Sequence, residues 1–216
     1  MAPKAFYCTA SFYSIQRVGQ VGINTVKREI SIIGWDDAPF RFGDKRTAIV
    51  GAVFRGGCWL DGVISGEIEV DGLDSSRRIA DAVCATPHRK HLRVIMLDGI
   101  TYGGFNVVDI GKLSDATGLP VIAVTRDKPD MASIRKALSR FSDSEERWKI
   151  MMEAGEMRPL DVMDPKTGKV KKIWFQNRGI DPGTAAKVIT VSSTRSFIPE
   201  PLRVAHLIAH GTGGKR

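Results

Sequence analysis

Cysteine, long apolar runs and internal repeats are scarce or absent in this sequence. Its three cysteines, Cys8, Cys58 and Cys84, are odd in number and form no C-x-x-C spacing, which argues against a disulfide framework and against a zinc knuckle. No apolar run is long enough to span a membrane, and residues 1–16 carry too many polar groups for a secretory signal. The sequence therefore predicts a cytoplasmic protein with no membrane partner.

Cationic residues outnumber anionic ones. Lysine and arginine total 32 against 24 aspartates and glutamates, so the formal net charge is +8. An excess of this kind favours binding to nucleic acid or another polyanion, with an ordinary soluble surface as the alternative. Because the chain has 216 residues, 43% of them hydrophobic, it is long enough to bury one sizeable core.

The hydrophobic pattern sets the expected limits of this single domain. Residues 1–29 show no sustained period and are typical of an N-terminal extension, either flexible or bound to a partner. We expect the domain at residues 30–211 and a disordered tail at residues 212–216.

Within the domain, apolar runs and turn residues predict strands separated by helices. Five strands are expected: residues 30–35, one on each side of the turn at 55–57, 94–97 and 121–124. Two further short strands, residues 160–163 and 171–176, flank a hairpin-like turn. Helices are expected after Asp74, from the cap Asn106 to Gly118, and over residues 127–141, 142–156, 182–193 and 199–211.

This order of elements predicts the fold class. Short strands that are apolar throughout are typical of a parallel sheet covered on both faces. We expect an α/β fold with a mixed five-stranded sheet flanked by helices, in which the second and third strands are antiparallel and the rest parallel.

Three acidic residues occupy related places in this arrangement. Asp36 ends the first strand, Asp98 ends the fourth, and Asp74 begins the helix after the third. Carboxylates at one edge of an open sheet can share Mg²⁺ or Mn²⁺, which would activate water for phosphodiester hydrolysis. The alternative is that all three are turn or cap residues. Asp37 is the reserve ligand, although its side chain should point to the opposite side of the strand.

Several segments together resemble a known family. The sequences "IIGWDDAPF", "VDGLDSS", "VIMLDGITYGGFNVVDI", "TGLPVIAVTRDKPD" and "EERWKIMMEAG" are similar to the mostly archaeal UPF0215 family, also called DUF99. That family in turn is similar to endonuclease V, which has a ribonuclease H-like fold and cuts nucleic acid near deaminated purines with a divalent metal. The resemblance therefore implies a ribonuclease H-like domain and a metal-dependent nuclease.

The resemblance also implies roles for particular residues. Asp36 matches the first metal ligand, Asp98 the third, and Arg126 the position of a lysine near the reacting phosphate. The second ligand falls nearest Asp74, with Asp71 as a close competitor.

The chain also departs from the endonuclease V pattern. Thr184 stands where endonuclease V has the histidine of a Pro-Gly-His turn, and Gly104 stands where a histidine is expected after Asp-Gly. The Tyr-Ile-Pro segment that parts the bases is absent from "DGVISGEIEVDG". These departures put the recognition of deaminated bases in question.

Other polar residues give weaker indications. The basic segment "PHRKHLR" and the residues after the fifth strand predict nucleic-acid contacts at Arg89, Lys90, His91, Arg126 and Lys128, with a solvated loop as the alternative for the first three. His206 and His210 are four residues apart on a predicted helix and could bind one metal, but the pattern favours exposed histidines.

These observations lead to two hypotheses for function. The first is a metal-dependent nuclease in which Asp36, Asp74 and Asp98 bind Mg²⁺ or Mn²⁺ and Arg126 stabilises the developing charge. The second is a catalytically inactive protein that binds nucleic acid or a ribonucleoprotein.

Overall fold

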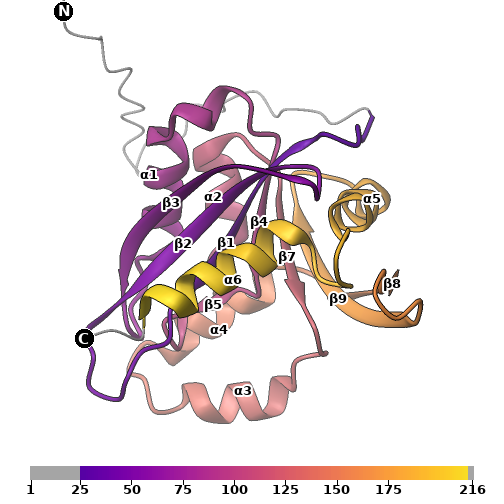
Figure 1. The fold of residues 1–216 in the computed structure, drawn as a ribbon. Helices are drawn as coiled ribbons and strands as arrows, with labels where there is room; N and C mark the ends of the chain where they lie inside the picture. Colours follow the sequence, from indigo (N-terminus) through magenta and orange to yellow (C-terminus); the bar gives the residue numbers. More distant parts are fainter. Residues whose placement is uncertain (1–24, 214–216) are drawn as a thin grey trace, which may run out of the picture.

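The fold is built on one large mixed sheet. The computed structural model describes residues 25–213, so the predicted extension lies mostly outside the described residues, as do the last three residues of the predicted tail. The sheet has seven strands in the order β3-β2-β1-β4-β7-β9-β8 (Figure 1). The prediction of five strands is wrong, because the two short strands near the C-terminal end of the sequence join the same sheet beyond β7.

The first half of the chain forms the sheet centre and one edge. Its elements are β1 (Ser31–Asp37), β2 (Arg46–Arg55), β3 (Trp59–Glu69), α1 (Ser75–Ala85), the 3-10 helix η1 (Pro87–Lys90), β4 (Val94–Asp98), β5 (Thr101–Tyr102), β6 (Asn106–Val107) and α2 (Ile110–Thr117). As predicted, β2 is antiparallel to β1 and β3 is antiparallel to β2, whereas β4 is parallel to β1.

The second half extends the sheet and adds the remaining helices. Its elements are β7 (Val121–Thr125), α3 (Met131–Leu138), α4 (Ser144–Glu153), β8 (Arg158–Met163), β9 (Val170–Arg178), α5 (Pro182–Ser192) and α6 (Glu200–Gly213). Strand β7 is parallel to β4, but β9 and β8 each run antiparallel to their neighbour. Helix α6 continues past the predicted domain limit at residue 211. Among residues 25–213 no helix has the length and apolar character needed to cross a bilayer.

Helices cover both faces of the sheet. Alternate residues of β1 divide between two cores: Ile33 and Trp35 pack with the α1 and α2 side, whereas Ile32 packs with the α5 and α6 side. Helix α6 crosses β2 and β1 on its face of the sheet (Figure 1). Gly34 makes this close crossing possible, because a Cβ atom there would lie 2.4 Å from the backbone of Pro201.

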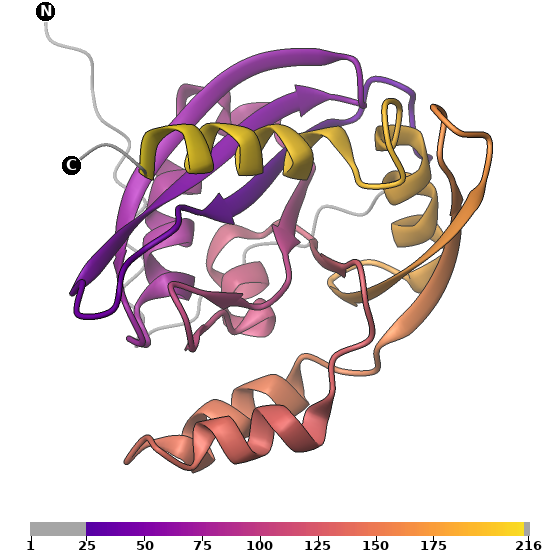
Figure 2. The same ribbon diagram turned by 60° about the horizontal axis from the view of Figure 1, so that its bottom comes forward.

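Helices α3 and α4 form a pair that projects from the rest of the molecule (Figure 2). Arg147 of α4 attaches this pair to the sheet layer, because its buried guanidinium donates hydrogen bonds to the backbone carbonyls of Asp71, Gly72 and Phe105. The same guanidinium forms an ion pair with Asp143 at the start of α4. Arg147 thus provides a polar attachment for the base of the pair, beside the apolar contact of Leu138 and Met151 with Val107.

One predicted helix start is wrong. Asp109, rather than Asn106, caps α2 by accepting a hydrogen bond from the backbone of Lys112. Asn106 lies in the short strand β6, and its side chain binds Glu69, Asp74 and Ser75, which are 31 to 37 residues away in sequence. The predicted end of this helix at Gly118 is confirmed by its left-handed φ of +66°.

Candidate metal centre

Two aspartates meet at the carboxyl edge of the sheet centre. Strands β1 and β4 are parallel neighbours with Trp35 opposite Leu97, so Asp36 and Asp98 follow at the same level. The alternation of side chains places both aspartates on the face that α6 covers. The prediction that Asp36 and Asp98 lie together at one sheet edge is therefore confirmed.

A buried tyrosine ties the ends of these two strands together. The hydroxyl of Tyr102 donates to the backbone carbonyl of Trp35 at 2.8 Å and accepts from the backbone N–H of Asp98 at 3.1 Å. The side chain of Tyr102 is fully buried, so this link is shielded from water. Sequence reasoning missed this residue, since nothing local marks a tyrosine that bridges two distant strand ends.

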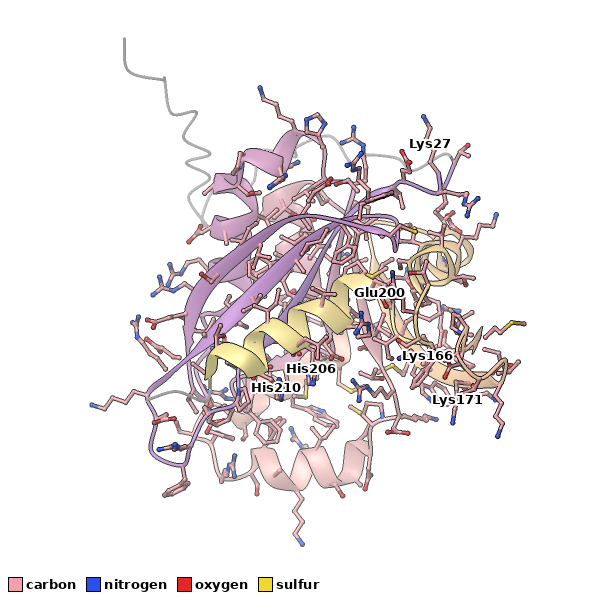
Figure 3. The ribbon with its side chains drawn as sticks, in the orientation of Figure 1. Lys27, Lys166, Lys171, Glu200, His206 and His210 are labelled. Carbon is pink, nitrogen blue, oxygen red and sulfur yellow. The ribbon has the colours of Figure 1, made fainter. Side chains whose placement is uncertain are left out.

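Two histidines of α6 complete the group. The Nδ1 atom of His206 lies 2.7 Å from Oδ2 of Asp36, and the rings of His206 and His210 are 3.9 Å apart between centroids. Figure 3 shows both histidines on α6. One ligand atom from each of Asp36, His206 and His210 lies within 4.8 Å of the others. The interpretation of both residues as merely exposed histidines is therefore wrong for His206, and the helical spacing that we noted was the useful signal.

Burial and electrostatic repulsion shift the pKa values of Asp36 and Asp98. Loss of solvation, followed by the charge of Asp98, raises the pKa of Asp36 to about 7, although the hydrogen bond with His206 opposes this. Burial also raises the pKa of Asp98, against the attraction of Arg126 and His206. The folded protein thus holds two carboxyl groups that a nearby cation would help to ionise.

These pKa shifts predict that the metal-free protein becomes less stable as pH rises. The folded-state pKa of Asp36 lies above its ordinary value, so the folded state binds more protons than the unfolded state between pH 3.8 and about 7. The free energy of unfolding should therefore fall as pH rises through this interval. We expect Asp36→Asn to be more stable than wild type at pH 8 by about 1–3 kcal/mol and to lose that advantage near pH 4. Denaturant titrations with EDTA at both pH values measure this, and a less stable variant at pH 8 would contradict it.

Asp74 is not brought to this group. It begins α1 on the opposite face of the sheet, and its carboxylate accepts hydrogen bonds from the backbone of Glu69 and from the side chains of Asn106 and Arg78. The bonds from Asn106, Glu69 and Arg78 outweigh desolvation and lower its pKa. The competitor Asp71 is likewise engaged, because its Oδ1 accepts from the backbone of Phe105 at 2.8 Å.

Asp37 is on the other side of β1 from Asp36, as expected from alternation. Its Oδ2 accepts a hydrogen bond from the backbone N–H of Gly103, at 2.9 Å, in the turn between β5 and β6. Burial raises the pKa of Asp37, and the charge of Asp98 raises it further. The hydrogen bond from Gly103 and the charge of His210 lower it in part. Asp37 therefore fixes the β5–β6 turn beside the centre and adds negative charge to it.

The basic residues predicted to contact nucleic acid separate into two groups. Arg126 is exposed directly after β7, and its charge is the strongest of those that lower the pKa of Asp98. Lys128 lies nearby, with its Nζ 5.2 Å from the ring centroid of Trp174. The other group, Arg89, Lys90 and His91, precedes β4 and so lies at the opposite edge of the sheet from Asp98, where Arg89 donates to the carbonyl of Thr117.

The donor set fits a divalent cation. Within residues 25–213, no lysine or arginine forms an ion pair with Asp36 or Asp98, although both carboxyl groups are desolvated. Carboxylate oxygens suit Mg²⁺ and Mn²⁺, and an imidazole is acceptable to Mn²⁺. Asp36, Asp98, His206 and His210 are thus the residues that could hold such an ion.

Comparisons with known proteins identify the family of this chain. The sequence profile of a family described as endonuclease dU matches residues 28–212. A UPF0215 protein from Methanothermobacter thermautotrophicus is 50% identical over 188 residues, which cover 86% of this chain and 89% of the relative. The resemblance to UPF0215 predicted from the sequence is confirmed.

Solved structures have the same fold. A protein of unknown function from Archaeoglobus fulgidus aligns with a TM-score of 0.72 and 35% identity, covering 83% of this chain and 95% of that one. Endonuclease V from Ciona intestinalis, in complex with DNA that contains inosine, aligns with a TM-score of 0.53 and 14% identity over 81% of this chain and 82% of that one. At this identity the second likeness concerns the fold alone.

Proposed function

This chain belongs to the endonuclease dU family, and from that premise we propose that it is a divalent-metal-dependent endonuclease that cuts DNA at or near deoxyuridine. The observation that carries the proposal is the meeting of Asp36 and Asp98 with His206 at one sheet edge. The strand order and the likeness to endonuclease V also support a ribonuclease H-like fold.

Each residue of the centre has a distinct part in this proposal. Asp36, His206 and His210, whose ligand atoms lie within 4.8 Å of one another, hold the metal. Asp98, whose charge raises the pKa of Asp36, is the fourth candidate ligand. When bound, Mg²⁺ or Mn²⁺ supplies a Lewis acid and an activated water for phosphodiester hydrolysis. We leave Asp74 out of the ligand set, because three hydrogen bonds already occupy its two oxygens.

Surrounding residues position the substrate and the ligands. The exposed guanidinium of Arg126 lies close enough to Asp98 to attract it, so it can also attract the phosphate held there and stabilise charge that develops during cleavage. Tyr102 keeps the ends of β1 and β4 at a fixed separation, which holds the two carboxylates in register.

The arrangement favours an enzyme over an inactive binding protein. A binder that had kept the sheet but lost catalysis would be expected to neutralise the two carboxylates with a lysine or arginine. Among residues 25–213 the only ion-pair partner of Asp36 is His206, a side chain that can also bind a metal. The desolvated acids are therefore better explained by a bound cation.

A cleavage assay on matched DNA strands tests the proposal. The substrates are labelled oligonucleotides of one sequence that carry deoxyuridine, inosine or only ordinary bases, each incubated with Mg²⁺, Mn²⁺ or EDTA. We expect metal-dependent cleavage that is fastest beside deoxyuridine and absent in EDTA. Because the basic surface contacts phosphates, binding should weaken steeply with added salt. Affinity should barely change when inosine replaces adenosine, and a tenfold preference for inosine would reveal recognition of a deaminated purine, which this proposal does not include.

A further inference from the structure

A preformed turn in the loop between β1 and β2, which begins just after Asp36, displays an aromatic side chain. The backbone N–H of Asp44 donates to the carbonyl of Arg41 at 3.1 Å, which closes a β-turn with Phe42 and Gly43 in its middle. Gly43 has a φ of +95°, the left-handed conformation that glycine supplies at this position of a turn. The carboxylate of Asp44 also accepts from the backbone N–H of Arg41 at 2.6 Å. The turn is therefore fixed without help from the side chain of Phe42.

Phe42 is fully exposed. Its relative exposure is 108%, the highest of the large hydrophobic side chains in the described part of the chain. Burial of a phenylalanine stabilises a fold by roughly 1.5–3 kcal/mol, and this residue contributes nothing of that kind. The display of Phe42 is thus unexplained by the folding of this domain.

The base of the same loop is attached to the metal centre. Ala38, two residues after Asp36, packs against Ala209 of α6, which directly precedes His210. The backbone N–H of Ala38 donates to Ala48, and its carbonyl accepts from the hydroxyl of Thr47. The loop therefore leaves the centre from a rigid base, and Phe42 stands at its tip.

Two cations flank Phe42 on this loop, with Asp44 between them. Arg41 and Lys45 are exposed on the same loop and form no ion pair in the part of the chain that the structure describes. An aromatic ring beside free cations is the combination that single-stranded nucleic acids use, because bases stack on the ring while phosphates meet the charges.

We propose that Phe42 stacks on an unpaired nucleobase of the strand that the metal centre holds, with Arg41 and Lys45 contacting the adjoining phosphates. This inference rests on the proposed function, since it places the strand at Asp36 and Asp98. The stacked base lies on the same side of the sheet as the cleaved phosphodiester, because the loop begins at the strand end that carries Asp36.

The test measures binding without cleavage. A single-stranded oligonucleotide with deoxyuridine is titrated in EDTA against wild type, Phe42→Ala, Phe42→Trp and Trp59→Ala, with fluorescence anisotropy as the readout. Trp59 is the matched control, because it is 60% exposed but lies at the opposite end of β2 and β3. We expect Phe42→Ala to raise the Kd about tenfold or more, and Phe42→Trp and Trp59→Ala to bind like wild type. All three variants should fold normally, since both side chains are exposed.

A second readout locates the base. The fluorescent base 2-aminopurine, placed at successive positions of the same strand, should be quenched by wild type at one position, and Phe42→Ala should abolish that quenching. The proposal would be overturned if wild type and Phe42→Ala bound equally well. It would also be overturned if Trp59→Ala lost as much affinity as Phe42→Ala, or if wild type did not bind. Wild type that binds in this way but never cleaves with Mg²⁺ or Mn²⁺ would instead refute the proposed function and leave the stacking in place.

Discussion

Asp98→Asn is expected to lower the rate of metal-dependent DNA cleavage at least about a hundredfold, which corresponds to about 2.7 kcal/mol of transition-state stabilisation. The substitution keeps the shape of the side chain but removes the negative charge that faces Asp36 and a bound cation. Single-turnover cleavage of the deoxyuridine strand with Mn²⁺ measures the rate, and calorimetric titration with Mn²⁺ measures the accompanying loss of metal affinity.

A measurement of stability distinguishes this loss of cleavage from misfolding of the variant. Because burial raises the pKa of Asp98, its charged form is unfavourable in the metal-free fold, so the variant should be at least as stable as wild type at pH 8. Asp81→Asn is the matched control, since Asp81 forms only an exposed ion pair with Arg77 on α1. Cleavage by Asp98→Asn within about tenfold of wild type would remove Asp98 from the proposed centre.

Arg147→Ala is expected to destabilise the protein by about 3–5 kcal/mol, because it breaks a buried charged hydrogen-bond network. The guanidinium makes five hydrogen bonds, to the carbonyls of Asp71, Gly72 and Phe105 and to both oxygens of Asp143. Alanine leaves these carbonyls without their donor and removes the polar attachment of the α3–α4 pair to the sheet layer.

Denaturant unfolding measures this loss. Arg77→Ala is the control, because Arg77 is half-exposed and its ion pair with Asp81 should contribute about 0.5 kcal/mol or less. If the two alanine variants unfold at similar denaturant concentrations, the Arg147 network contributes far less than its geometry indicates. Arg147→Lys should recover only part of the loss, since an ammonium has three donors and no planar fork.

The strand ends of the candidate site were predictable because their signals are local. Short apolar runs that stop at an aspartate identify β1 and β4, and parallel strands present their carboxyl ends at one edge. This reasoning found Asp36 and Asp98. It favoured Asp74 as well, because a helix start after a strand resembles the same pattern. A hydrogen bond from the side chain of Asn106, 32 residues away, gives Asp74 a different role, together with one from the nearby backbone of Glu69.

Packing between distant segments could not be predicted. The apolar face of α6 identifies Leu202, Ala205 and Ala209 as core residues, but helical periodicity does not say which face of which sheet they cover. The position of His206 depends on that choice. It also depends on Gly34, whose missing side chain lets α6 approach β1, and a glycine in an apolar run does not reveal what it contacts.

The extent of the sheet beyond β7 also could not be predicted from the sequence. The segments that form β8 and β9 are predicted as strands, because two short segments flank a hairpin-like turn. Their partner was not predictable, since pairing of β9 with β7 depends on tertiary packing against α5 rather than on residues within the strands. The sequence therefore indicated where β8 and β9 lie along the chain, but not that they join the large sheet.

The contact between His206 and Asp36 joins residues that are 170 positions apart in the chain. During translation the carboxylates of β1 leave the ribosome first, whereas the imidazole arrives only after the whole sheet has been made. A growing chain therefore carries an incomplete centre while it is still close to messenger and ribosomal RNA. The order of synthesis therefore delays assembly of the proposed metal centre until the last helix has docked on the sheet.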